Sequence, residues 1–221
     1  MRKSFLAGLA LTLVASVIAI PGHATPANPA SAPLGVIVQA DRAQVGADIT
    51  SGGATIYDGD RLETQETGTL RARMGGSQIY LRQSSAADVH GLPNGFSANL
   101  VYGTVVLSSL EGQTFQLLAN GATIRPSGNH STVAQVTYVN PTALLLTSER
   151  GTIEITMGDE VKTVEAGSSY RMETQPDDSG PGPQGGPYHT AKNHFVLIAI
   201  IAAAAATGIV AWRALMSPSG L

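Results

Sequence analysis

The stretch that decides the fold lies between Ile56 and Leu81. It reads Ile56-Tyr-Asp-Gly-Asp-Arg-Leu-Glu-Thr64 and then Gly68-Thr-Leu-Arg-Ala-Arg-Met-Gly-Gly-Ser-Gln-Ile-Tyr-Leu81. Asp58-Gly59-Asp60 has the composition of a tight turn, because Gly adopts positive φ readily and Asp bonds to nearby backbone. Polar and apolar residues alternate from Thr69 to Met74, the period of a half-buried strand, and Gly75-Gly76 then reverses the chain. The stretch predicts strand, turn, strand, turn, strand.

The same pattern continues on both sides of this stretch, from Leu34 to Met172. Short alternating segments are separated by turns that contain glycine, and none shows a helical stripe. Val101–Leu107 is expected to form one strand, with Val101, Gly103, Val105 and Leu107 on one face. Ala143–Ser148 fits a strand or a helix by period, and its length favours a strand. The fold class is therefore all-β, as a two-sheet sandwich or β-roll of short antiparallel strands.

The composition excludes several classes of function. The chain has 221 residues, a net charge of −3 and no cysteine. The charge gives no electrostatic basis for binding nucleic acid, and the lack of cysteine rules out disulfides and thiolate metal sites. Aromatic residues make up only 5% of the chain, which disfavours a broad aromatic platform for sugars.

The N-terminal segment has the features of an export signal. Arg2 and Lys3 precede an apolar run from Phe5 to Ile20, and Gly22-His23-Ala24 offers the small residues of a cleavage site. This predicts a signal peptide over residues 1–24, with an uncleaved anchor as the alternative. A Pro/Ala spacer over residues 25–33 follows, and the β-domain is expected over residues 34–173.

The C-terminal segment predicts a membrane anchor. Residues 174–193 are rich in Pro and Gly and predict a flexible linker. The run Phe195–Trp212 is uncharged and about long enough to cross a bilayer, and Arg213 follows it as a charged stop. We expect a transmembrane helix over residues 194–213 and a short cytoplasmic tail over residues 214–221. The alternative is a helix buried in the domain.

Several short motifs together resemble one family, the FecR-type periplasmic domain named for the ferric-citrate sensor. They are Gly59-Asp60-x-Leu62-x-Thr64, Gly76-Ser77-x-Ile79-x-Leu81, Gly103-x-Val105, Phe115-x-Leu117, Gly151-x-Ile153-x-Ile155 and Val164-x-Ala166-Gly167. The resemblance implies an all-β extracytoplasmic domain that binds proteins and has no catalytic machinery. Only Met1–Ser4 precede the first apolar run, so the sigma-factor-binding region of that family is not expected here.

With this resemblance, the layout predicts a single-pass protein of the bacterial inner (cytoplasmic) membrane, with its β-domain in the periplasm or outside the cell. The expected function is a protein-interaction or envelope-sensing module, neither an enzyme nor dependent on a cofactor. Its partner would be an envelope protein, either an outer-membrane receptor or a separate signalling protein. The alternative is a glycan-binding or structural envelope protein, which a row of Tyr57, Tyr80 and Tyr102 on one face would favour.

Candidate site residues are few. Arg71, Arg73 and Arg82 are expected on one sheet face, where they either dock an acidic partner or form a solvated surface. Ala204 and Gly208 are small residues four apart, which predicts a helix-packing face and a homodimer through the span. Asp88 and His90 would share one face of a strand, but no third ligand is in view and His130 is far away in the sequence, so no metal site is expected. Asp58 and Asp60 flank a turn without the rest of a Ca²⁺ pattern, and Ser84-Ser85 and Ser108-Ser109 lack a catalytic context.

Overall fold

The computed structural model describes residues 32–174 and 195–200, and within these ranges every regular element is a strand. The all-β class is therefore confirmed. The signal peptide, most of the spacer, the linker and the tail lie outside the described residues, as do Ala204 and Gly208.

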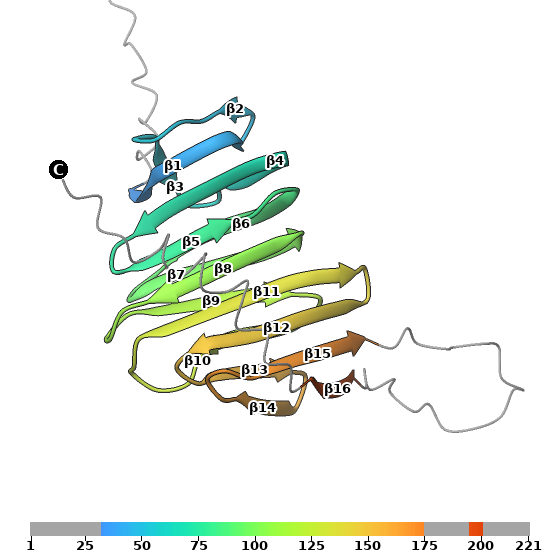
Figure 1. Ribbon diagram of the computed structural model, residues 1–221. Coiled ribbons are helices and arrows are strands. Elements are labelled where there is room, and N and C mark those ends of the chain that lie inside the picture. The colour runs from blue at the N-terminus through green and yellow to red at the C-terminus, as the bar shows by residue number, and fades with distance from the viewer. Residues whose placement is uncertain (1–31, 175–194, 201–221) are drawn as a thin grey trace, which may run out of the picture. The chain divides into compact units, whose positions relative to one another are not determined.

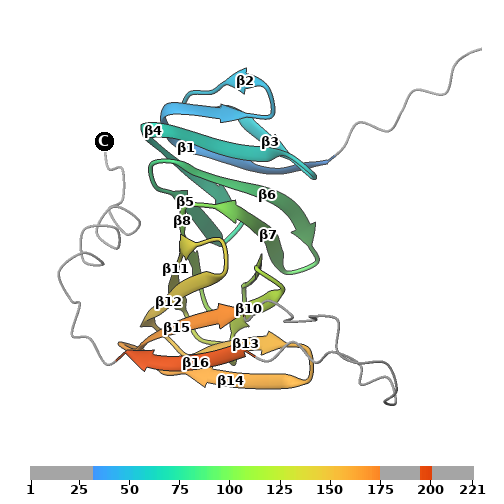
Figure 2. The same ribbon diagram turned by 90° about the vertical axis from the view of Figure 1, so that its right-hand side faces the viewer.

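One continuous sheet folds back on itself to make two layers (Figures 1 and 2). The first layer contains, in order of pairing, β4 (Arg61–Met74), β5 (Ser77–Leu81), β8 (Thr104–Ser109), β11 (Thr132–Asn140), β12 (Ala143–Arg150), β15 (Ser169–Thr174) and β16 (Phe195–Ile200). The second layer contains β6 (Ser85–Leu92), β7 (Gly95–Tyr102), β9 (Thr114–Ala119), β10 (Ala122–Pro126), β13 (Ile153–Met157) and β14 (Glu160–Val164). At one end β1 (Pro33–Val45) pairs with β4 and with the short strands β2 (Asp48–Ile49) and β3 (Thr55–Tyr57).

Strand β4 joins the two layers. Its first part, Arg61–Thr64, pairs with β6, and its last part, Leu70–Met74, pairs with β5. Between these parts the backbone of β1 comes so close that a Cβ at Gly68 would lie 2.2 Å from the Arg42 carbonyl oxygen. Only glycine fits such an approach, so Gly68 allows the long strand to serve both layers.

The inner faces of the two layers form the core. Leu70, Ala72 and Met74 alternate inward along β4 and are at most 2% exposed, as the period-two pattern predicts. Phe96 on β7 and Phe115 on β9 are the largest fully buried side chains and lie opposite each other in register. The predicted strand, turn, strand, turn, strand over Ile56–Leu81 is confirmed as β3, β4 and β5, and Ala143–Ser148 is a strand, as its length favoured.

Two expectations about strands are wrong. Val101–Leu107 is not one strand, because Gly103 has a φ of +85° and divides it into β7 and β8. These two strands belong to different layers, so the chain changes layer at this glycine. The second wrong expectation is that all strands pair antiparallel. After β7 the chain crosses to the first layer as β8, and it then returns to the second layer as β9, which pairs parallel with β7.

The expected membrane helix differs from the structure where the two can be compared. Phe195–Ile200 forms strand β16, which lies beside β15 (Figure 2) and pairs antiparallel with it, with Ile200 opposite Ser169. An apolar run of this kind suits a strand or a helix, and the free edge of β15 provides backbone partners that only a strand can use. In the described ranges, no helix has the length and hydrophobicity to cross a membrane. The rest of the expected span lies outside them.

Candidate interaction face

The Asp58-Gly59-Asp60 turn ties the β3–β4 connection to β6. Gly59 has a φ of +86°, as the turn signature predicts, and its N–H donates to the Val89 carbonyl at 2.8 Å. The Asp58 Oδ1 atom accepts a hydrogen bond from the Gly91 N–H at 2.8 Å. Asp60 closes the turn itself, because its Oδ2 atom accepts from the Tyr57 N–H at 2.7 Å. Both carboxylates thus hold backbone in place, which supports the turn interpretation of this motif.

Thr64 and Gly103 hold the loop between β5 and β6. The buried Thr64 hydroxyl accepts a hydrogen bond from the Ser85 N–H at 3.0 Å and donates to the Arg82 carbonyl. A Cβ on Gly103 would lie 2.3 Å from both the Ser84 carbonyl and the Ser85 hydroxyl oxygen. The Ser85 hydroxyl in turn accepts from the Thr104 N–H at 2.8 Å. These contacts give Ser85 a structural role at the crossing between layers.

The remaining motif residues also serve the scaffold. Leu62 is fully buried in the core. The buried Ser77 hydroxyl donates to the Thr114 carbonyl at 3.3 Å, and a Cβ on its neighbour Gly76 would lie 2.8 Å from the Gln113 side chain. Ser148 connects the last two glycines. Its hydroxyl donates to the Gly151 carbonyl at 2.6 Å, and its carbonyl accepts from the Gly167 N–H at 2.7 Å.

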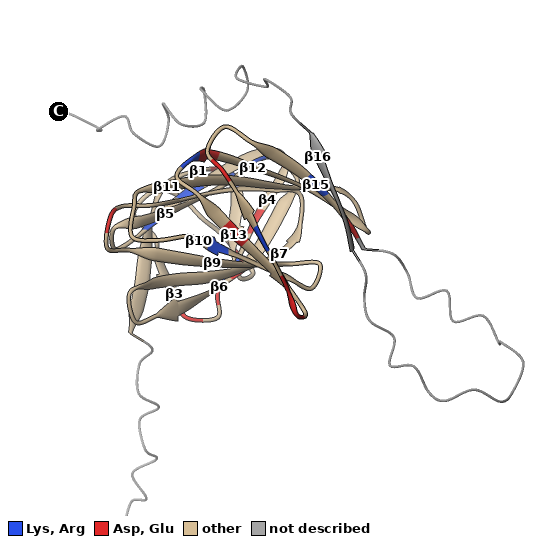
Figure 3. Ribbon diagram, turned by 90° about the horizontal axis from the view of Figure 1, so that it is seen from below, with Lys and Arg blue, Asp and Glu red and all other residues tan. Residues whose placement is uncertain are grey.

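The histidines and nearby carboxylates have separate partners. His90 Nδ1 lies 3.5 Å from Asp58 Oδ1, whereas Asp88 Oδ1 lies 3.8 Å from Arg61. His130 belongs to a different loop, next to Gly128. Among the described residues, no three His, Asp or Glu side chains gather in a way that could hold a metal ion. Figure 3 shows that the positions of the charged residues are spread over several strands and turns of the ribbon.

We use the name outer face for the side of the first layer that points away from the core. One row of residues crosses it, each directly opposite the next on the neighbouring strand: Arg71, Tyr80, Val106, Gln135, Thr147 and Ser169. Val133 on β11 and Glu149 on β12 also point to this side, since each is next to a buried inward residue, Ala134 and Ser148 respectively.

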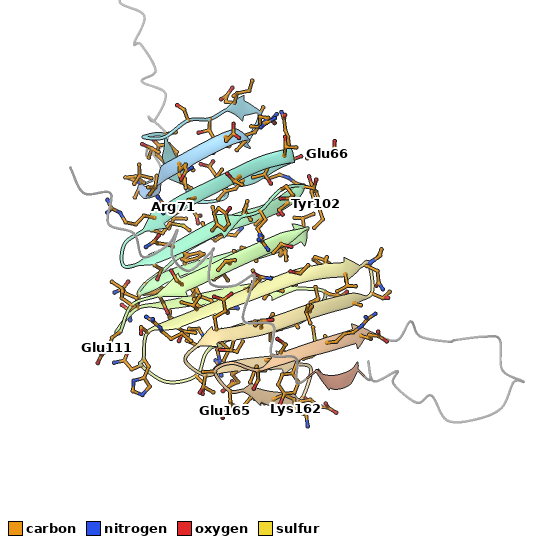
Figure 4. All side chains as sticks on the ribbon, in the orientation of Figure 1. Glu66, Arg71, Tyr102, Glu111, Lys162 and Glu165 are labelled. Carbon is orange, nitrogen blue, oxygen red and sulfur yellow. The ribbon has the colours of Figure 1, made fainter. Side chains whose placement is uncertain are left out.

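The three predicted arginines are on this outer face. Arg71 and Arg73 alternate with the buried residues of β4, and Figure 4 labels Arg71 at the end of its strand. Arg82 follows β5, where its N–H donates to the Thr104 carbonyl at 3.1 Å. Burial raises the pKa of Glu149 on β12, while the positive charge of Arg82 acts in the opposite direction, so these two groups share the face. Their use by a partner stays a prediction.

The three tyrosines have different surroundings. Tyr80 packs on the outer face against Val106 and Val133. Tyr102 ends β7 in the second layer, where its hydroxyl donates to Glu63 Oε1 at 2.8 Å and this bond raises its pKa (Figure 4). Tyr57 is 44% exposed on β3. Because Tyr80 and Tyr102 belong to opposite layers, the row that would favour glycan binding is not formed.

Sequence reasoning missed the most unusual feature of the outer face, its apolar centre. Val106 and Val133 point outward but are only 0% and 1% exposed, and with Tyr80 they form a small cluster separate from the core. The alternation of Val105, Val106 and Leu107 signals that one of them must point outward. The sequence offers no signal that an outward valine is shielded from water.

The fold is thus an all-β, two-layer domain, and its candidate site is an arginine-edged face with an apolar centre. No protein-family model matches the chain, and neither does any curated protein sequence. The structure is similar to two crystal structures of a putative anti-sigma factor from Parabacteroides distasonis ATCC 8503, determined at 1.65 and 2.50 Å resolution. Each has a TM-score of 0.48 and 9% sequence identity, and the match covers 69% of this chain and 63% of the other. The match therefore spans less than two thirds of that protein, and similarity at this level carries no argument about function.

Proposed function

We propose that this protein is an exported, non-catalytic module of the FecR type that binds an acidic partner protein of the cell envelope through its arginines. One observation carries the proposal: Arg71 and Arg73 on β4, and Arg82 directly after the neighbouring strand β5, point to the same side of the first layer. Arginine forms bidentate hydrogen bonds with carboxylates and is enriched at protein interfaces. An acidic surface on an outer-membrane receptor or on a separate signalling protein fits this edge.

The roles found for the motif residues support a binding module over an enzyme. Thr64, Ser77 and Ser85 direct their hydroxyls to backbone groups, and the carboxylates of Asp58 and Asp60 accept backbone N–H donors. Catalytic groups need a mutual geometry that places them around a reacting atom. These five side chains serve the turns and loops of the scaffold, so the proposal assigns the function to the surface.

The cellular location belongs to the same proposal. The predicted signal peptide would export the domain across the bacterial inner membrane, and the predicted helix over residues 194–213 would anchor it there. That helix and strand β16 use the same residues, Phe195–Ile200, and so are alternative states of this segment. Once β16 has formed, residues 201–212 are too few to cross a bilayer, which takes about 20. The anchored state therefore requires β16 to be released.

The test is a crosslinked capture from native membranes with matched charge variants. The wild-type chain, Arg73→Glu on the outer face and Lys162→Glu on β14 would be compared, and the captured material would be identified by mass spectrometry and glycan analysis. Both substituted residues are exposed, so the fold should tolerate either change. We expect one protein partner that is retained by Lys162→Glu and lost with Arg73→Glu. Equal capture by both variants, or recovery of polysaccharide without protein, would overturn the proposal.

A further inference from the structure

Strand β14 forms an open edge of the second layer. It lies at one end of the sheet (Figure 2), and within the described ranges it pairs only with β13. Strand β1, which also borders the sheet, is covered by the loop between β2 and β3. There the Gly53 N–H donates to the Ile37 carbonyl at 2.8 Å, and the Ile37 N–H donates to the Ala54 carbonyl at 2.8 Å. An edge without such a cover offers its N–H and C=O groups to another strand.

The side chains of β14 combine one exposed valine with two opposite charges. Val161 points outward and is 54% exposed. Glu160 and Lys162 flank it and point to the inner side, where Lys162 lies opposite the buried Ile155 on β13. Both charged side chains are exposed, and Figure 4 labels Lys162 at this end of the molecule. The exposed stretch of the edge therefore reads negative, apolar, positive.

Charged residues on an edge strand usually prevent pairing with other chains. A single charge has this effect because an incoming strand leaves it without a partner, and two charges of one sign also repel a second copy. The charges of β14 differ from both cases. Glu160 and Lys162 have opposite signs and lie symmetrically about Val161, so the sequence is complementary to itself when two copies run antiparallel.

We propose that β14 pairs antiparallel with β14 of a second copy, about a two-fold axis at Val161. In this register Glu160 of each copy lies opposite Lys162 of the other, and the two Val161 residues lie opposite each other. Opposite charges and β-branched residues that face each other across antiparallel strands stabilise the pair. Two-fold symmetry forms the ion pair twice.

The charges also select this register over its neighbours. A shift by one residue would turn the inner side of one copy toward the outward side of the other. The two nearest registers that keep the inner sides together place Glu160 opposite Glu160, or Lys162 opposite Lys162. Like charges directly opposite each other are unfavourable. The register centred on Val161 gives both charges of the strand a partner of opposite sign.

The backbone of β14 suits the same register. Gly158 and Asp159 form a two-residue turn between the paired residues Met157 and Glu160. The pair that closes such a turn is hydrogen-bonded, so Glu160 directs its N–H and C=O groups toward β13. These directions alternate along a strand, so Val161 directs its groups toward the open edge. Two copies centred on Val161 therefore exchange two backbone hydrogen bonds.

This contact is separate from the proposed partner site. Strand β14 belongs to the second layer, whereas Arg71, Arg73 and Arg82 lie on the outer face of the first layer. Lys162→Glu should break the contact between copies and still retain the envelope partner. The inference is therefore independent of the proposed function, and the two can fail separately.

The test exchanges the charges in the full chain. The sequence has no cysteine, so Val161→Cys supplies a single site for a short bis-maleimide crosslinker in the cells that express the protein. Lys162→Glu leaves two negative charges and Glu160→Lys two positive ones, and we expect either change to lower the crosslinked dimer by about tenfold. The variant with both changes restores the complementary pattern and should recover the dimer, which also verifies that the fold tolerates both.

A mixing experiment gives the same test without a crosslinker. The Lys162→Glu chain and the Glu160→Lys chain each repel their own copies, but they are complementary to each other. When the two are expressed together with different affinity tags, purification through one tag should recover the other chain. Two differently tagged copies of Lys162→Glu should not recover each other.

The control for the crosslink is Asn99→Cys, an exposed position of the second layer away from β14. It should give little dimer. Crosslinking at Val161→Cys that is equal in all charge variants, or no greater than at Asn99→Cys, would overturn the proposal, and a dimer formed through the predicted span would give that result. A crosslink from Val161→Cys to a different protein would assign the edge to a strand of that protein. No crosslink with the native charges would show that β14 stays unpaired.

Discussion

The two layers present very different surfaces to their surroundings. On the second layer, outward residues such as Val101 and Leu118 are 38% and 39% exposed, and Asn99 beside Leu118 is exposed as well. On the first layer, the outward residues Val106 and Val133 are 0% and 1% exposed. Both surfaces belong to one continuous sheet with one core, so strand pairing alone does not cause the difference.

This contrast distinguishes a surface suited to water from one suited to contact. A sheet needs one apolar face to fold, and its second face becomes apolar and buried where something packs on it. The first layer has the arginines at the β4–β5 side and the shielded valines at its centre. The second layer has no such centre among the outward residues named above. Functional contacts are therefore expected on the first layer. Substitutions at the crossing between the layers and on each outward face would test this contrast.

The largest effect is expected where the chain passes from one layer to the other. Gly103→Ala places a Cβ 2.3 Å from the Ser84 carbonyl oxygen at a residue whose φ is +85°. We expect a loss of at least about 3 kcal/mol of unfolding free energy, from the clash and the strained backbone together. Gly167→Ala is the control, because Gly167 has a φ of +80° but a Cβ there would meet no described atom within 4 Å.

Chemical denaturation of both variants measures the difference. The control should lose only about 1 kcal/mol, the ordinary penalty of a left-handed backbone for a residue with a Cβ. Equal losses in the two variants would mean that the loop at Ser84 moves away freely, and that close packing does not fix the crossing between layers.

The contrast between the faces is tested by the same substitution on each layer. Val106→Asp puts a charge at this buried outward position, and we expect it to cost about 2 kcal/mol, close to the burial energy of one valine. Val101→Asp on the second layer should change the unfolding free energy by no more than about 0.5 kcal/mol, as is usual for surface sites. Thermal and chemical unfolding of the full-length variants would show this. If Val106→Asp is as mild as Val101→Asp, the two faces are equivalent.

Sequence reasoning works best where local chemistry decides the structure. The β3–β4–β5 stretch was predictable because Gly59 and Gly75 adopt positive φ and the residues between them alternate with period two. Strands β6 and β7 were missed, although Asn94-Gly95 between them is a typical hairpin signal. The division at Gly103 could not be read from alternation, which runs through this residue without a break. It depends on the distant loop at Ser84 and Ser85.

Only part of the candidate site could be predicted from the sequence. Alternation along β4 correctly placed Arg71 and Arg73 on an outward face. The burial of the outward Val106 could not be predicted, because a period-two pattern says which face a residue occupies but not how exposed that face is. The strand at Phe195–Ile200 was missed for a related reason, because hydropathy alone does not reveal whether an apolar run meets lipid or the edge of a sheet.

A smaller effect is expected for the Thr64 hydroxyl, which holds the loop between β5 and β6. Thr64→Val conserves shape but leaves the Ser85 N–H without its acceptor in a buried place. We expect a loss of about 1 to 2 kcal/mol from this unsatisfied donor. Thr123→Val on β10 is the control, because Thr123 lies between two buried residues and points outward. A neutral Thr64→Val in chemical denaturation would show that another group satisfies Ser85.

The smallest effect concerns Glu149 and depends on pH. Burial raises the pKa of Glu149 above its ordinary value of 4.5, although the Arg82 charge opposes this shift. The folded state therefore keeps its proton to higher pH than the unfolded state does, and it loses stability as the pH rises through that interval. Glu149→Gln should unfold at a slightly higher denaturant concentration than the wild type at neutral pH. The difference should vanish below the ordinary pKa of a glutamate, where the carboxyl group is protonated in both states. A Glu149→Gln variant that is less stable at neutral pH would mean that attraction to Arg82 outweighs burial, and the outer face would then be held together by its charges as well as by its apolar centre.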